Sequence, residues 1–203
     1  LEVTEDAVAT VRGVWRCGRP GARRLVLGSH IDTVVNAGRF DGPLGVVAPI
    51  LALQAAIGAG RAPALDIDIV AFGDEEGSRF PTTFAGSQTL TGTFDPAHLE
   101  GRDADGVSLR EALVAFGKDP SAIAAGRLDP TRHAGFLEVH IEQGPVLEGE
   151  GLALGIVEAI VGQTRGVLAI GGRAGHAGTV PMGYRQDAFV TAAEIALALE
   201  ARA

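Results

Sequence analysis

The sequence predicts an α/β fold in which a mostly parallel sheet is flanked by helices, and three observations lead to this prediction. Short runs of Val, Ile and Leu, bounded by Gly, Pro and Asp, alternate along the chain with longer runs rich in Ala and Leu. An order of strand, helix and strand is typical of parallel pairing. Of the 203 residues, 46% are hydrophobic, which is ample for a packed core.

The strands of this sheet are expected in four segments. They are residues 8–17, 24–31, 65–72 and 136–141. A turn at Gly18–Gly21 separates the first two segments. Residues 25–28 are continuously apolar, as expected of a strand that is buried on both faces.

Helices are expected between the strands and after the last of them. The Ala- and Leu-rich residues 44–57 form the clearest helix, and they follow a loop at 32–43. Residues 84–91 and 108–116 have helical character as well. A further helix is expected from Gln186 onward.

A change of pattern near Val161 predicts a second domain. Residues 164–170 resemble a strand and precede a Gly-Gly turn and the last helix, which is a new unit that cannot bury its face alone. We therefore expect one domain at 1–161 and the beginning of a smaller α+β domain at 162–203. Because Leu1 is not a start residue and the last helix ends without a cap, we expect both ends to continue in a longer protein.

Charge and composition exclude several classes of function. The formal net charge is −8 and no Lys/Arg cluster interrupts it, which argues against nucleic-acid binding and against an anionic membrane surface. No apolar run approaches the roughly 18 residues that span a bilayer. The single cysteine, Cys17, excludes an internal disulfide framework, is expected to be structural, and fits a reducing cytoplasm.

Polar clusters fall at the ends of predicted strands or in the loops that follow them, where open α/β sheets bind ligands. Four such clusters occur, at residues 28–33, 40–45, 73–80 and 138–144. In the first, His30 and Asp32 lie two residues apart in an extended segment and should point the same way. Such a pair suits an imidazole that binds metal while a carboxylate holds its other nitrogen.

Each cluster also has an ordinary structural interpretation. Asp41 could cap the helix that follows it, and the acidic run 74–76 could be a solvated loop. His140 could be a hydrogen-bonded core histidine, and His98 and His133 are interpreted as surface residues. The recurrence of His, Asp and Glu at comparable strand ends nevertheless favours a metal site.

The residue types in these clusters narrow the choice of metal ion. A mixed set of imidazoles and carboxylates suits Zn²⁺, Mn²⁺ or Co²⁺ better than Ca²⁺ or a structural zinc held by cysteines. The adjacent Glu75 and Glu76 allow one carboxylate to bind metal while the other transfers protons.

Five strings in order along the chain carry a resemblance to a known family. They are GSHIDTV, AGRFDGPLGV, AFGDEEGSRFP, HIEQGPVLE and GHAGTVPMGYRQDA, between about Gly28 and Ala188. Together they resemble the carbamoylase/allantoate amidohydrolase branch of the aminoacylase-like dinuclear metallopeptidase superfamily. The resemblance implies a zinc-exopeptidase-like catalytic domain, followed by a lid domain through which two copies form a homodimer.

The resemblance implies roles for individual residues around two divalent ions, Zn²⁺ or Mn²⁺. His30, Asp41, Glu76 and His140 would be metal ligands, with Asp41 bridging the two ions. Glu75 would be the general base that acts on the bridging water.

Further roles implied by the resemblance concern orientation and the substrate. Asp32 would hold the His30 ring. His176, in the lid, would reach the substrate carbonyl, commonly in the partner subunit's site. Gln143 and Arg185 would be neighbours of the substrate, and Arg79 would support its own loop.

The implied reaction is hydrolysis of a C–N bond in a small ureido or carbamoyl substrate, either allantoate or an N-carbamoyl-L-amino acid. The string Asn36-Ala37-Gly38, where many carbamoylases carry a double glycine, favours allantoate. The resemblance also implies a further metal-binding histidine, and an Asn and an Arg of the lid that bind the substrate carboxylate. None of these three has a counterpart in the 203 residues, so we expect an incomplete site that is inactive alone.

Three alternatives stay open at this stage. One is a dipeptidase or aminopeptidase of the same superfamily, and another is a catalytically silent metal-binding or dimerisation module. A nucleotide-binding domain is disfavoured, because no GxGxxG follows the first buried strand.

Overall fold

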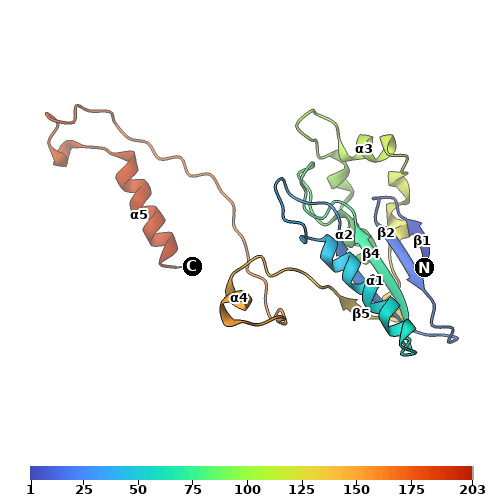
Figure 1. The fold of residues 1–203 in the computed structure, drawn as a ribbon. Coiled ribbons are helices and arrows are strands. Elements are labelled where there is room, and N and C mark those ends of the chain that lie inside the picture. Colours follow the sequence, from blue (N-terminus) through green and yellow to red (C-terminus); the bar gives the residue numbers. More distant parts are fainter. Residues whose placement is uncertain (203) are drawn as a thin grey trace. The chain divides into compact units, whose positions relative to one another are not determined.

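The computed structural model describes residues 1–202 and divides into two compact units, one of residues 1–151 and one that begins at Leu152. The first unit contains the sheet and most of the helices, and the second contains one long helix (Figure 1). The domain boundary expected near Val161 from the sequence stays a prediction.

The first unit is built on a five-stranded sheet in the order β1-β2-β4-β3-β5. Its strands are β1 (Glu2–Glu5), β2 (Val11–Trp15), β3 (Arg24–His30), β4 (Asp66–Phe72) and β5 (His133–Leu137). β3 pairs in parallel with both β4 and β5, whereas β2 is antiparallel to β1 and β4 and so runs opposite to the other four strands. The predicted α/β class is confirmed. β1, a short exposed strand at the edge of the sheet, was not predicted.

Two predicted strands are wrong in part. The strand expected at 136–141 lies three residues earlier, because its position is fixed by the register with β3, which pairs Arg24 with His133 and Leu27 with Leu137. Residues 138–141 leave the sheet. No strand forms over 164–170, where the chain has no partner to complete a hydrogen-bonded ladder.

The predicted helices are confirmed to within a few residues. The α-helices are α1 (Pro43–Gly58), α2 (Ala85–Thr91), α3 (Leu109–Ala115), α4 (Val146–Glu150) and α5 (Ala188–Glu200), and short 3₁₀ turns occur at Pro96–Glu100, Pro120–Gly126, Pro130–Arg132 and Met182–Tyr184. α3 begins with a capping box in which Ser108 and Glu111 satisfy each other's backbone N–H groups. The last residue of the helix expected to the chain end, Ala203, lies outside the described residues. Across 1–202, every helix is too short or too polar to traverse a lipid bilayer.

The core of the first unit lies on both faces of the sheet, and all seven residues of the central strand β4 are buried. Alternate residues of β4 face opposite sides, as strand geometry requires. Ile67 and Ile69 pack against Leu53 of α1, while Val70 and Phe72 pack against Leu90 of α2. Each fully buried apolar side chain of this size stabilises the fold by about 1.5–3 kcal/mol. The carboxyl ends of β3 and β4 are therefore firmly positioned.

A charge cluster occupies the same sheet face as Val70, nearer the amino end of β4. The Asp68 carboxylate is fully buried and accepts two hydrogen bonds from the Arg24 guanidinium. Arg12 Nη2 lies 3.2 Å from Asp68 Oδ2, and His133 Nε2 lies 3.6 Å from the same oxygen. The interpretation of His133 as a surface residue is wrong, because its side chain is only 12% exposed and faces this buried carboxylate. Three strands and the start of β5 meet at Asp68.

Candidate metal centre

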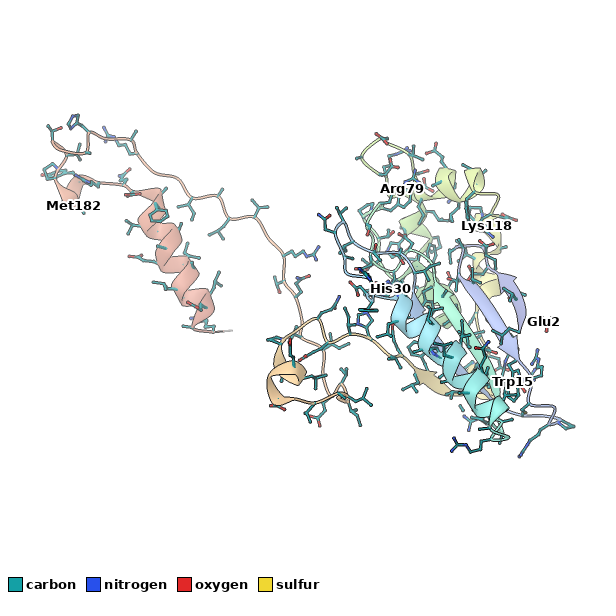
Figure 2. The ribbon with its side chains drawn as sticks, viewed as in Figure 1. Glu2, Trp15, His30, Arg79, Lys118 and Met182 are labelled. Atoms are coloured by element: carbon teal, nitrogen blue, oxygen red, sulfur yellow. The ribbon has the colours of Figure 1, made fainter. Side chains whose placement is uncertain are left out.

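The candidate centre lies where parallel strands end. His30 is the last residue of β3, the acidic loop 74–76 follows β4, and His140 lies three residues beyond β5. Because β3, β4 and β5 run parallel, their carboxyl ends meet at one edge of the sheet. Asp41 reaches the same edge from the loop that precedes α1. Figure 2 labels His30 at this edge, beside the start of α1.

Three side chains that the sequence analysis proposed as metal ligands converge. Single donor atoms of His30, Asp41 and His140 all lie within 4.8 Å of one another. His140 Nε2 is 3.4 Å from Asp41 Oδ1, and the centroids of the two imidazoles are 5.7 Å apart. His30 and Asp41 are 4% and 5% exposed. A buried carboxylate without a positively charged partner is costly, so a cation would stabilise the cluster.

The hydrogen bonds of both imidazoles leave one nitrogen free for a cation. His30 Nδ1 lies 2.7 Å from the carbonyl oxygen of Asp32, and His140 Nδ1 lies 2.8 Å from that of Ile141. Because a carbonyl oxygen can only accept, Nδ1 carries the proton in each ring. In the neutral rings the unprotonated Nε2 atoms remain, and that of His140 faces Asp41. Two nitrogen lone pairs beside a carboxylate suit a divalent ion such as Zn²⁺ or Mn²⁺.

A second cluster shares His30. Single donor atoms of His30, Glu75 and Glu76 lie within 4.8 Å of one another, and His30 Nε2 is 4.0 Å from Glu75 Oε2. The Asp32 carboxylate holds this acidic loop, because its two oxygens accept the backbone N–H groups of Glu75 (3.2 Å) and Glu76 (2.9 Å). The same carboxylate is 3.9 Å from His30 Nδ1, so it is the Asp32 carbonyl that makes the short contact with the ring. Asp32 thus connects the His30 strand end to the glutamate pair.

The surroundings of Glu75 favour its protonated form. Burial raises the pKa of the Glu75 carboxyl, His30 lowers it, and the negative charges of Glu76, Asp32 and Glu138 raise it further. A carboxylate with a raised pKa is a stronger base near neutral pH than an exposed glutamate. The environment therefore suits Glu75 for proton transfer.

Asp74, the first residue of the same acidic loop, has a buried carboxyl. Burial and the charge of Asp32 raise its pKa from 3.8 to about 6, with the Thr82 hydroxyl opposing the shift. Because the folded chain holds this proton more tightly than the unfolded chain, the stabilisation due to Asp74 is fully present below pH 3.8 and is lost as the pH rises through about 6.

The Asp74→Asn variant should lose this part of the pH dependence and be the more stable chain at pH 7. Asparagine also tolerates the positive φ of 50° at this position. Urea unfolding at pH 4.5 and pH 7, in the presence of a chelator, would measure the difference between the two chains. If the difference in stability between the two chains is the same at both pH values, the Asp74 carboxyl is not buried as described.

Gly42 allows the Asp41 loop to approach His30. Its φ is +80°, and a Cβ atom there would lie 2.5 Å from His30 Nδ1 and 2.5 Å from the His30 carbonyl oxygen. A Gly42→Ala change is therefore expected to displace His30 and to destabilise the fold by more than 1 kcal/mol. Urea unfolding and Zn²⁺ titration of the variant should both show a loss. Gly58→Ala is the matched control, since a Cβ there meets nothing within 4 Å.

The other residues proposed from the sequence are placed differently. The Gln143 amide donates to both oxygens of Asp41, at 3.0 and 3.1 Å, so it lies in the cluster and contacts a proposed ligand. Arg79 Nε donates to Asp103 Oδ2 at 2.9 Å, consistent with loop support. His176 and Arg185 belong to the second unit, where Arg185 donates to the carbonyl oxygens of Val180 and Ala177.

One contact of the site was not predicted from the sequence. The hydroxyl of Ser29, which is fully buried, donates to the carboxylate of Glu138. Both residues lie in motifs identified from the sequence. Ser29 directly precedes His30, and Glu138 lies two residues before His140. Their closeness in sequence to the proposed ligands was the available signal, but the contact between segments more than a hundred residues apart depends on the fold.

The fold and the site define an α/β protein with a candidate metal centre at the carboxyl edge of its parallel strands. The chain belongs to peptidase family M20/M25/M40, whose family model matches residues 26–201. The resemblance found in the five sequence motifs is thereby confirmed.

Relatives with assigned names come from plants and bacteria. Allantoate deiminase of Arabidopsis thaliana is 42% identical over 98% of this chain and 39% of its own length. N-carbamoyl-L-amino acid amidohydrolase of Geobacillus stearothermophilus is 42% identical over 100% of this chain and 50% of its own length. A crystal structure of a hydantoinase/carbamoylase family amidase from Burkholderia ambifaria superimposes with a TM-score of 0.77 at 34% identity, covering 98% of this chain and 48% of that one. The chain thus spans half the length of these relatives or less.

Proposed function

We propose that this chain carries the greater part of the metal-binding site of an amidohydrolase that cleaves a non-peptide C–N bond. The substrate would be a small ureido or carbamoyl compound, either allantoate or an N-carbamoyl-L-amino acid, as the names of the relatives suggest. The observation that carries the proposal is the convergence of His30, Asp41 and His140, with Nδ1 of each imidazole beside a backbone carbonyl oxygen.

The donor set fits divalent ions, and two are proposed. His30, Asp41 and His140 would hold the first, and Asp41 and Glu76 would contribute to the second. When bound, such ions lower the pKa of a water molecule and offset negative charge that develops on the substrate oxygen. The excess of carboxylates at this edge, which includes Asp32 and Glu75, favours cations over a neutral ligand.

Glu75 would move the proton. Its carboxylate lies next to the ligand His30, and its raised pKa suits it to take a proton from the attacking water. The water oxygen would then bond to the carbamoyl or amidino carbon, and the C–N bond would break as Glu75 returns the proton to the leaving nitrogen. Asp32 would keep Glu75 in place through its hydrogen bond to the backbone of that residue.

His176, in the second unit, would assist at the substrate carbonyl, commonly in the partner subunit's site. The backbone N–H of Gly178 donates to His176 Nδ1 at 3.0 Å, so the neutral ring carries its proton on Nε2. An Nε2–H group is a suitable donor to a substrate carbonyl oxygen that gains negative charge. We propose further that residues 162–203 contribute to a lid through which two copies form a homodimer, and that the enzyme is cytoplasmic.

Metal binding is the first test. The 203-residue chain should bind Zn²⁺ or Mn²⁺ in equilibrium dialysis, and the His140→Ala variant should bind at least about 100-fold more weakly, because one of three donors is lost. The matched control is His98→Ala, which removes a histidine that packs edge-on against Phe94. Equal affinity of the His140 variant and the unmodified chain would contradict the proposed site.

Substrate class has to be tested on a chain extended to the full length of the relatives, since these 203 residues cover only 39–50% of that length. Hydrolysis of allantoate, of N-carbamoyl-L-amino acids and of dipeptides would be compared under metal-loaded conditions. Turnover of either ureido substrate is expected. Turnover of dipeptides alone would instead assign a peptidase of the same family and overturn the proposed substrate class.

A further inference from the structure

Ser29 is a fully buried hydroxyl that the proposed reaction does not use. It lies on β3 directly before His30, and its Oγ donates to the carboxylate of Glu138. Glu138 directly follows β5 and lies two residues before His140. One hydrogen bond therefore joins the two segments that supply the imidazoles.

The segment that carries Asp41 meets the same point. A Cβ atom on Gly45, near the start of α1, would lie 2.4 Å from Ser29 Cβ and 2.4 Å from the carbonyl oxygen of Val139. The backbone of α1 thus packs against both Ser29 and the residue that follows Glu138. All three segments that bring the proposed donors into contact meet at this point.

The contact opposes a repulsion within the site. The negative charge of Glu138 acts on Glu75 together with the charges of Asp32 and Glu76. Without an ion, these carboxylates repel one another and tend to spread the segments apart. A hydrogen bond from a buried hydroxyl to a carboxylate is charge-assisted and is stronger than one between neutral groups. It is therefore well placed to hold Glu138, and with it the 138–140 segment, against β3.

We propose that Ser29 and Glu138 are positioning residues that fix His140 relative to His30 and Asp41 before any ion binds. The inference rests on the proposed metal site for its functional meaning. It also makes a structural statement about the ion-free chain, because the His140 ring is oriented by the same segment that Ser29 holds.

The structural statement can be tested without metal. In NMR spectra of the ion-free chain, the Nδ1–H protons of His30 and His140 should both be protected from exchange, since each is bonded to a carbonyl oxygen. In the Ser29→Ala variant the nuclear Overhauser contact between the His30 and His140 rings, whose centroids lie 5.7 Å apart, should be lost while the His30 Nδ1–H signal persists. Retention of the contact between the two rings in the variant would overturn the inference whatever the affinity for metal.

The functional statement is tested with a double-mutant cycle on Co²⁺ binding, read from its visible absorption. Ser29→Ala and Glu138→Ala should each weaken binding about 10-fold and alter the spectrum, in the range seen when groups that orient metal ligands are removed. The double variant should bind Co²⁺ no more weakly than the single variant of lower affinity, since both changes break the same hydrogen bond. Independent, additive losses would contradict the positioning role.

Two further variants complete the design. Glu138→Gln keeps an oxygen that can accept from Ser29 and should retain more affinity than Glu138→Ala. Ser87→Ala removes an exposed hydroxyl that donates to the Phe84 carbonyl oxygen and should change nothing. Absence of Co²⁺ binding by the unmodified chain would reject the proposed metal site, whereas binding that is unaffected by Ser29→Ala would reject the positioning role alone.

Discussion

Replacing Glu75 with Gln should lower kcat by about 10²–10⁴ when the chain is extended to its relatives' full length and loaded with metal, while leaving the metal content unchanged. The amide preserves the size of the side chain and its place beside His30, but it cannot accept a proton at neutral pH. The raised pKa of Glu75, which is caused mainly by burial, is the property that the variant removes.

The measurement pairs steady-state kinetics with metal analysis of the same preparation. Glu76→Gln serves as the matched control, because the neighbouring carboxylate is proposed as a ligand and its loss should reduce metal content. Activity of the Glu75 variant within a factor of about three of the unmodified enzyme would remove Glu75 from the reaction. A loss of metal from the Glu75 variant would show that Glu75, and not Glu76, is the metal ligand.

The site could be predicted from the sequence to the extent that it depends on strand ends. The buried apolar run 25–28 and the run 65–72 locate β3 and β4, and these strands carry His30 and the acidic loop to the same edge. His140 was also assigned correctly to that edge, although β5 lies three residues earlier than predicted. An apolar segment alone does not define its register, which depends on the partner strand.

Details that depend on tertiary contacts were not available from the sequence. Alternation predicted that the Asp32 carboxylate would hold the His30 ring, but the chain leaves the strand after His30, and the carboxylate instead accepts the backbone N–H groups of Glu75 and Glu76. The burial of His133 beside Asp68 is likewise a property of the folded sheet. Local patterns identify which residues lie near a strand end, whereas their partners are selected by packing.

The strand expected at 164–170 shows a limit of a different kind. Its composition favours a strand, but a strand forms only where a neighbour completes the backbone hydrogen bonds. The described part of the second unit offers an antiparallel bridge between Arg173 and Gln186 and the helix α5, and no strand pairs with 164–170. Propensity thus predicted a strand for which residues 1–202 provide no partner.

Removal of the buried charge at Asp68 should cause the largest loss of stability. The Asp68→Asn change leaves the guanidinium groups of Arg12 and Arg24 without their anion, and an uncompensated buried charge typically costs about 3–5 kcal/mol. The Arg12 site is already unfavourable for a cation, since burial lowers the pKa of its guanidinium and Asp68 opposes that shift. Folded domains are stable by only about 5–15 kcal/mol, so much of the stability would be lost.

Asp66→Asn is the matched comparison for Asp68, because the two residues lie two positions apart on the same face of β4. Asp66 is buried, but its partner Arg16, at 3.0 Å, has a side chain that is 54% exposed, so solvent screens this pair more than the pairs of Asp68. The Asp66 carboxylate also accepts the backbone N–H of Cys17, which adds a modest cost to its loss. Urea unfolding at pH 7 with a chelator should therefore show a much lower stability for Asp68→Asn than for Asp66→Asn. Equal midpoints would mean that the arginines find other partners, and that the charge cluster does not hold the strands together.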